Sequence, residues 1–130
     1  MTNKELMDLA ISARENSYSK YSGFSVGAAL LAKSGKVYLG CNIENASFSP
    51  TCCAERTAFF SAIAAGEREF VSIAVCGGKN GENRIKCMPC GVCRQVMSEF
   101  CSKDFIILLE DGESVISMTL EDLLPFSFNM

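Results

Sequence analysis

Two short, nearly continuous apolar runs, at residues 70–76 and 105–109, flank a segment with helical periodicity at residues 90–100. Apolar runs of this length are typical of strands that are covered on both faces. A strand, a helix and another strand in this order form a right-handed crossover, which makes the two strands parallel neighbours. The sequence therefore predicts an α/β sheet with helices packed on its faces.

The rest of the chain adds to this unit without a repeat, a low-complexity segment or a linker. The remaining predicted elements are, in chain order, a helix at residues 4–16 capped by Thr2 or Asn3, a hairpin of strands at 24–32 and 36–42, a loop at 44–52, a helix at 53–65, a loop at 77–83, a strand at 114–118 and one helical turn capped by Thr119 and Asp122. A length of 130 residues suits one core, so we expect a single domain over residues 1–130.

Eight cysteines and no histidine restrict the chemistry of this chain. Without histidine there is no serine–histidine–aspartate triad and no imidazole metal ligand, so a general acid or base must be a carboxylate, Lys, Tyr or Cys. The N-terminus is polar and charged, and no apolar run approaches the ~20 residues that cross a bilayer. We therefore expect a cytoplasmic protein with reduced thiols and no membrane contact.

Three cysteines stand at the starts of predicted helices. Cys53 opens one helix, and Cys90 and Cys93 open another in a Cys-x-x-Cys spacing. Because both helices pack on one side of the sheet, three sulfurs can converge on one tetrahedral ion where two positive helix ends meet. The spacing alone also allows a redox pair, thiols that bind nothing, or a closed four-thiolate zinc site that uses Cys87 with Cys52 or Cys53. The other cysteines are expected to be small core residues, namely Cys41, Cys76 and Cys101.

The residues around these thiols carry a family resemblance. The segments Cys53-Ala54-Glu55-Arg56 and Pro89-Cys90-Gly91-Val92-Cys93-Arg94-Gln95 together resemble the two-part zinc signature known for the cytidine deaminases. The resemblance continues over residues 18–28, 42–46 and 123–125. It implies a three-layer α/β/α fold, in which a mixed five-stranded sheet carries helices on both faces.

The same resemblance implies a reaction. One zinc ion per chain is held by Cys53, Cys90 and Cys93, and zinc-bound hydroxide is the nucleophile that attacks C4 of cytosine. Glu55 takes a proton from the zinc-bound water, delivers it to N3 and then carries a second proton to the amino group, which leaves as ammonia. Arg56 is expected to hydrogen-bond the thiolates, whose three charges leave the zinc site at −1.

A substrate site follows from the resemblance as well. Asn42 and Glu44 are implied to hold the ribose of cytidine or deoxycytidine, with Phe24 against the base and Ala54 beside it. Asn42 and Glu44 are two residues apart, so on an extended segment they face the same way, and the carboxylate disfavours a 5′-phosphate. Phe128 is expected to reach a neighbouring subunit of a homotetramer. The implied role is pyrimidine salvage.

Some positions depart from the family pattern. Phe48 stands where relatives commonly carry Tyr, and Phe126 precedes Ser127 and Phe128 where many relatives have smaller residues. Arg94 is expected to stabilise a subunit contact or a helix face.

Three rival functions remain at this stage. The first is deamination of another cytosine compound such as blasticidin S, and the second is a structural-zinc or redox module, which would leave Glu55 without a role. The third is editing of nucleic acids, which a net charge of −3 and the lack of a basic run disfavour.

Overall fold

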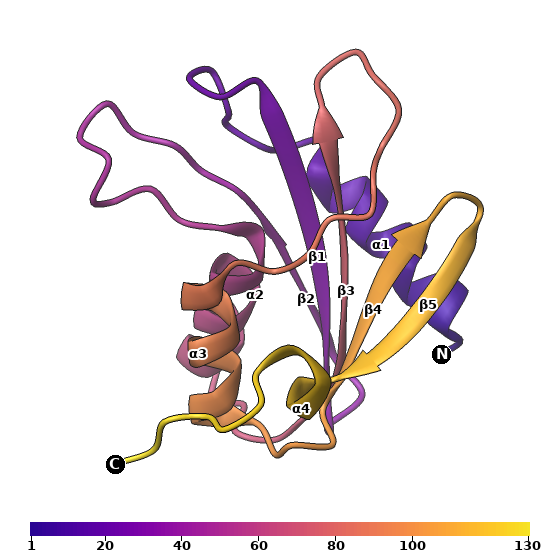
Figure 1. The fold of residues 1–130 in the computed structure, drawn as a ribbon, viewed down its shortest axis with the longest axis vertical. Helices are drawn as coiled ribbons and strands as arrows, with labels where there is room; N and C mark the ends of the chain where they lie inside the picture. Colours follow the sequence, from indigo (N-terminus) through magenta and orange to yellow (C-terminus); the bar gives the residue numbers. More distant parts are fainter.

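The computed structural model describes residues 1–130 and contains a mixed five-stranded sheet with the strand order β2-β1-β3-β4-β5 (Figure 1). The helices are α1 (Asn3–Arg14), α2 (Ala54–Ala64), α3 (Gly91–Phe100) and α4 (Leu120–Leu123), and the strands are β1 (Phe24–Ala32), β2 (Val37–Cys41), β3 (Phe70–Lys79), β4 (Ile106–Asp111) and β5 (Ser114–Thr119). β3 and β4 pair in parallel and the other neighbours are antiparallel, which confirms the predicted crossover.

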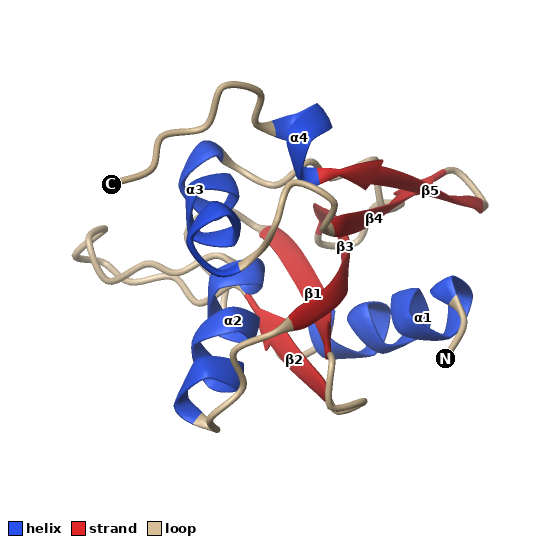
Figure 2. Cartoon of the chain, turned by 90° about the horizontal axis from the view of Figure 1, so that it is seen from below, coloured by secondary structure: helices blue, strands red, loops and turns tan.

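Helices cover both faces of the sheet (Figure 2). Alternate residues of β3 point to opposite faces, because side chains along a strand alternate. Ile73 and Val75 join one core with α2 and α3, whereas Ala74 and Cys76 join a second core with α1. The three-layer α/β/α arrangement is therefore confirmed, as is the prediction that α2 and α3 lie on one side.

Two glycines let the helices approach the sheet closely. A Cβ atom at Gly40 of β2 would lie 2.6 Å from the backbone nitrogen of Ala58 and closer still to the carbonyl oxygen of Ala54. A Cβ atom at Gly27 of β1 would lie 2.6 Å from the backbone nitrogen of Arg14, on the α1 side. The absence of a side chain at Gly40 thus sets how closely α2 packs on the sheet. The first turn of this helix carries candidate site residues.

An aromatic cluster joins α2 to α3 and the sheet. The ring of Phe59 is fully buried and lies 5.2 Å from the Phe70 ring, 6.2 Å from the Phe100 ring and 5.9 Å from the Phe105 ring, between centroids. Aromatic pairs at these separations are favourable beyond the area that they bury. The cluster fixes the relative positions of the two helices whose first residues carry the thiols.

β3 is longer than the sequence predicts. Residues 77–83 are expected to form a loop, but β3 continues to Lys79 because Gly77, Gly78 and Lys79 pair with the start of β1. Glycine reads as a loop residue in sequence, yet at Gly78 a Cβ atom would lie only 2.9 Å from Arg84 Cα, so the following turn folds back over a bare backbone. The loop prediction is therefore wrong for residues 77–79.

The predicted helix ends are mostly found. Thr2 caps α1, and Thr119 and Asp122 form the predicted capping box of α4. α1 ends at Arg14 rather than at residue 16, and the Arg14 guanidinium donates to the carbonyls of Ser25 and Gly78 at 2.7 and 2.8 Å. None of the helices has both the length and the hydrophobicity that crossing a bilayer requires.

Candidate active site

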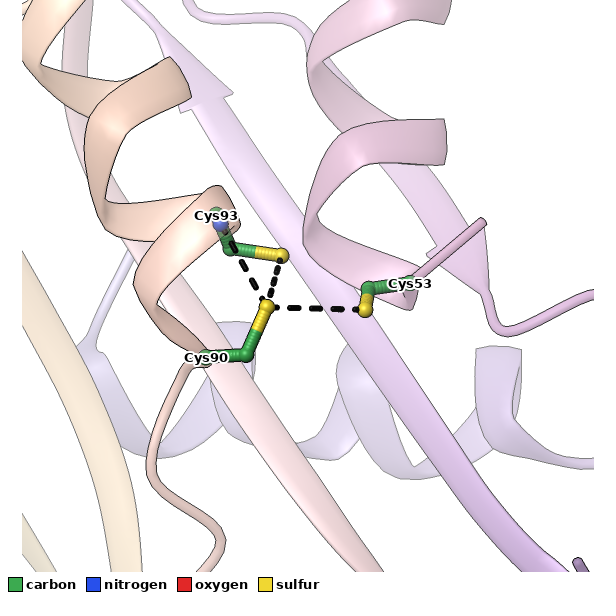
Figure 3. Close-up of side chains that lie close together, drawn as sticks. All are labelled: Cys53, Cys90 and Cys93. Atoms are coloured by element: carbon green, nitrogen blue, oxygen red, sulfur yellow. Dashed lines mark hydrogen bonds between the residues drawn. The ribbon is translucent and has the colours of Figure 1, made fainter. Parts of the chain in front are cut away.

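Three sulfur atoms meet where α2 and α3 begin (Figure 3). Cys53 is the N-cap of α2 and Cys90 the N-cap of α3, with Cys93 one turn further along α3. The Sγ atoms of Cys53 and Cys90 are 3.8 Å apart, and those of Cys90 and Cys93 are 3.4 Å apart. The backbone N–H of Cys93 donates to the Cys90 sulfur, so the helix end itself stabilises negative charge there.

This arrangement fits a tetrahedral zinc ion. Ligands at about 2.3 Å from zinc lie about 3.8 Å from one another, close to the observed sulfur separations. No other Cys, Asp or Glu joins the three sulfurs within 4.8 Å, so one of the four positions is free of protein. The chain therefore binds one zinc ion in an open site, and the closed four-thiolate alternative is wrong.

Two further cysteines lie close to this cluster without belonging to it. Cys87 precedes α3 and is held as a thiol, because burial raises its pKa to about 12. Cys52 lies in the loop between β2 and α2, as the sequence predicts, and its backbone pairs with Ile43 through two hydrogen bonds of 2.9 Å. That pairing ties the segment before Cys53 to the segment that follows β2.

Arg56 faces the thiols from the first turn of α2. Its Nη2 donates to Cys53 Sγ at 3.2 Å, and its Nε is buried without a hydrogen-bond partner. Hydrogen bonds from Cys93 and Arg56 lower the pKa of Cys53, which favours the thiolate form of this sulfur. A fixed cation beside the cluster offsets the charge of three thiolates on zinc.

Glu55 is the buried carboxyl next to the cluster. It follows Cys53 by two residues, and only 4 % of its surface is exposed. Burial raises the pKa of Glu55 to about 7, because desolvation disfavours the charged form. A carboxyl with such a pKa can accept and return a proton near neutrality, as a general acid and base must.

A cavity of about 350 Å³ opens onto these groups. It contains every predicted catalytic and substrate residue except Phe128, together with two of the three predicted ligands. Its walls are Ser22, Phe24, Val26, Asn42, Glu44, Thr51, Cys52, Cys53, Ala54, Glu55, Cys87, Met88 and Cys90. A larger cavity, of about 530 Å³, lies beside α1 and contains none of the predicted site residues.

Asn42 also holds the start of β1. Its Nδ2 donates to the carbonyl of Phe24 at 2.8 Å, and its Oδ1 accepts from the backbone N–H of Val26 at 2.9 Å and from Ser17 Oγ. One N–H of the amide remains for a ligand in the cavity. The sequence suggested a residue that only binds substrate, whereas this amide also positions Phe24.

Glu44 lies on the same cavity wall and is half-buried rather than buried. Its Oε1 accepts from the backbone N–H groups of Tyr21 and Ser22 at 3.0 Å each, and its Oε2 accepts from Ser22 Oγ. The hydroxyl of Ser22 is the main cause of the lowered pKa of Glu44, so the carboxylate stays charged. Ser22 lies within the segment 18–28 that carries the resemblance, but nothing in the sequence singled out its contact with Glu44.

Phe128 lies outside the cavity of its own chain. Its side chain is 66 % exposed, and its carbonyl accepts from Gln95 Nε2 at 3.2 Å. Phe48 is also exposed, on a small adjoining hollow beside Glu44. Arg94 does not simply cover a helix face, since its guanidinium bonds two carbonyls of its own chain.

Known proteins resemble the chain over nearly its full length. The family model of the cytidine and deoxycytidylate deaminase zinc-binding region matches residues 1–109. A cytidine deaminase from Sporosarcina psychrophila is 48 % identical over 118 residues, which cover 90 % of this chain and 84 % of the relative. One from Halalkalibacterium halodurans is 46 % identical over 129 residues, covering 98 % and 95 %.

A solved structure agrees. The crystal structure of cytidine deaminase from Burkholderia pseudomallei superposes with a TM-score of 0.89 at 46 % identity, covering 98 % of this chain and all of that one. The α/β/α layers and an open three-cysteine site beside a buried carboxyl define a zinc-dependent deaminase. Within that class, the chain belongs to the cytidine deaminase family.

Proposed function

We propose that this chain hydrolyses cytidine and deoxycytidine to uridine and deoxyuridine with release of ammonia. The observation that carries the proposal is the position of Glu55, a buried carboxyl on the cavity wall beside an open three-thiol metal site. A structural-zinc or redox module would have no use for a carboxyl whose pKa is raised to about 7.

Cys53, Cys90 and Cys93 hold the zinc ion in this proposal. When bound, zinc lowers the pKa of water and so supplies a nucleophile at neutral pH. Arg56 offsets the charge of the thiolates through its hydrogen bond to Cys53. The N-terminal end of α3 acts in the same direction, since the backbone N–H of Cys93 donates to the Cys90 sulfur.

Glu55 moves the protons. It accepts one from the attacking water and donates it to N3 of the cytosine ring, and it then takes a second proton from the new hydroxyl at C4 and passes it to the departing amine. Water supplies the new oxygen at C4, and the C–N bond breaks to leave ammonia and a uracil ring. The burial of Glu55 in the first turn of α2 keeps other water away from the carboxyl, and this keeps the pKa of Glu55 close to the working pH.

The remaining cavity residues bind the nucleoside. Glu44 accepts a hydrogen bond from a hydroxyl of the sugar with the lone pairs that Ser22 leaves free. Asn42 donates its second amide N–H to the nucleoside. Phe24 packs against the base, and Ala54 contributes the wall at the first residue of α2. Because Glu44 stays ionised, a 5′-phosphate is repelled and nucleosides are favoured over nucleotides.

The active assembly in this proposal is a homotetramer, with residues 1–130 of each subunit acting as one domain. Exposed aromatic side chains near the cavity and at the C-terminus support it, namely Phe48, Phe126 and Phe128. Phe128 then reaches the pocket of a neighbouring subunit. We place the enzyme in the cytoplasm, where thiols stay reduced, and assign it to pyrimidine salvage.

An absorbance assay tests the proposal. Cytidine, deoxycytidine, cytidine 5′-monophosphate and blasticidin S are offered to the protein at equal concentrations, and bound zinc is counted per chain. We expect turnover of both nucleosides, little turnover of the monophosphate, and one zinc ion per chain. Turnover of blasticidin S alone would identify blasticidin S as the substrate in place of cytidine. A zinc-loaded protein without any turnover would contradict the proposal.

A further inference from the structure

Arg94 joins two backbone segments that are far apart in the sequence. It follows Cys93 directly on α3 and is half-buried. Its Nε donates to the carbonyl of Pro89 at 2.8 Å, and its Nη1 donates to the carbonyl of Leu123 at 2.7 Å. A guanidinium suits this task, because its donors form a rigid planar fork that can bond two acceptors at once.

Both carbonyls lie at structurally sensitive positions. Pro89 is buried and directly precedes Cys90, so its carbonyl orientation affects the backbone that carries this ligand. Leu123 is the last residue of α4, where a helix leaves its final carbonyls without intrahelical donors. Arg94 therefore supplies a donor to the end of α4 and to the entry of α3 with one side chain.

A second contact extends the connection along the C-terminal segment. Gln95, the next residue of α3, donates from Nε2 to the carbonyl of Phe128 at 3.2 Å. The segment after α4 accordingly passes close to α3 before the chain ends beyond this helix (Figure 1). α4 is itself anchored, because Leu120 and Leu123 are buried in the same core as Met97 of α3.

We infer that Arg94 is a positioning residue for the reaction: its two hydrogen bonds fix the backbone that presents Cys90 and couple it to the segment that carries Phe128. Arg94 touches neither the sulfurs nor the cavity wall, so it acts through the backbone. The inference rests on the proposed function for the meaning of the site. Its test, however, measures zinc release and backbone exchange, neither of which requires a nucleoside.

The first experiment compares Arg94→Met and Arg94→Lys with a matched control, Arg68→Met. Arg68 also donates to two carbonyls, that of Ile63 in the last turn of α2 at 3.0 Å and that of Glu67 after the helix at 2.8 Å, but it lies at the far end of α2 from the thiols. Each zinc-loaded variant is mixed with a chromogenic chelator, and the rate of zinc release is recorded. Far-UV circular dichroism shows whether each variant is folded.

For Arg94→Met we expect zinc release that is faster by about 10- to 100-fold, the range typical for partners behind a ligand. Arg94→Lys should release zinc more slowly than Arg94→Met but faster than the unchanged protein, because an ammonium can bond one of the two carbonyls but does not have the planar fork. Arg68→Met should release zinc within about twofold of the unchanged protein. A folded Arg94→Met protein that releases zinc at the unchanged rate would overturn the inference.

The second experiment uses the unchanged protein, so it does not depend on the folding of a variant. Coupling between two sites is reciprocal, so zinc removal should loosen the tail if Arg94 couples the two. We expect hydrogen exchange of the amides at residues 123–128 to accelerate by about tenfold when zinc is stripped, while the amides of α1 are unaffected. Equal exchange of the tail amides with and without zinc would contradict the coupling.

Discussion

At the scale of single residues, burial decides which carboxyl does the chemistry. Glu55 and Glu44 line the same cavity, but burial raises the pKa of Glu55 whereas the hydroxyl of Ser22 lowers that of Glu44. One group therefore exchanges protons near neutrality, and the other remains a fixed negative charge. Two carboxyls with pKa values shifted in opposite directions are suited to an acid–base role and a binding role.

Glu55→Gln should abolish turnover without unfolding the protein. The amide has nearly the same shape but cannot accept or release a proton, whereas the carboxyl carries two protons in turn. We expect kcat/KM for cytidine to fall by at least about 10³-fold, with one zinc ion per chain retained. Steady-state absorbance kinetics and a metal count measure both quantities.

Glu99→Gln is the matched control, since Glu99 is an exposed carboxyl on α3. It should leave both kcat/KM and zinc content unchanged. Substantial activity in Glu55→Gln, or loss of zinc together with activity, would contradict the assignment of Glu55 as the proton carrier.

Ser22→Ala should shift the pH dependence of substrate binding. The pKa of Glu44 is lowered in the folded protein, so the charged form that binds the sugar is present above the ordinary pKa and is lost as the pH falls through the lowered pKa. Removing the Ser22 hydroxyl raises the pKa of Glu44 toward its ordinary value. The rise of KM on acidification should therefore begin at a higher pH in Ser22→Ala, as measured from pH 3.5 to 7.

Glu44→Gln provides the comparison for that experiment. It should raise KM by about tenfold or more, because a hydrogen bond to a charged acceptor is lost, and this rise should no longer depend on pH. An identical pH profile in Ser22→Ala and in the unchanged protein would mean that the hydroxyl does not control Glu44.

Some residues of the candidate site could be predicted from the sequence and others could not. Cys53, Cys90 and Cys93 were predicted to converge because helix starts and the crossover rule place their segments together, whereas the role of Glu55 came from the family resemblance. Ser22 was not singled out within the matched segment 18–28, and Cys87 was considered only as a zinc ligand. Neither was predicted to line the cavity, which each reaches through tertiary contacts. The hydrogen bonds of Asn42 to the β1 backbone were missed for the same reason.

At the scale of elements, the distance between α2 and the sheet is set by a residue that has no side chain. Gly40 of β2 lies under the first turns of α2, where Thr57 Oγ1 also donates to the carbonyl of Cys41 at 2.8 Å. The turn that carries Cys53 and Glu55 is thus fixed to the sheet directly. The sequence predicted the strand and the helix, but not this contact.

Gly40→Ala should displace α2 and damage the site. A Cβ atom would lie 2.6 Å from Ala58 N, which neither backbone can accommodate without moving. We expect the free energy of unfolding to fall by about 1–3 kcal/mol and kcat/KM to fall with it, because a small shift of the first turn misplaces both Cys53 and Glu55. Urea denaturation and steady-state kinetics measure these changes.

Gly91→Ala is the control for glycine replacement near the metal. Gly91 lies between two ligands, yet a Cβ atom there meets nothing within 4 Å. Its stability should change by no more than about 0.5 kcal/mol. If Gly40→Ala were as stable and as active as Gly91→Ala, close packing of α2 on β2 would not be what positions the site.

At the scale of the whole molecule, the cavity is flanked by apolar surface that a monomer would expose. Phe48 is 84 % exposed beside Glu44, and Phe128 is 66 % exposed on a segment held against α3. Phe126 is fully exposed and has a φ of 54°, a conformation that is uncommon for a bulky residue. These features support the proposed assembly, in which the C-terminal segments contact other subunits.

Mixing an impaired variant with an inactive one tests whether Phe128 acts on a neighbour. Phe128→Ala should lower kcat/KM by about tenfold or more, and Glu55→Gln should be inactive. Refolded together in equal amounts, the chains form mixed oligomers in which about one quarter of the sites combine an intact Glu55 with an intact Phe128 from another subunit. Activity should therefore exceed the sum of the two variants refolded separately. Phe126→Ala in place of Phe128→Ala is the control, since it leaves Phe128 intact in every chain. If the mixture only reaches that sum, then Phe128 acts within its own chain or not at all.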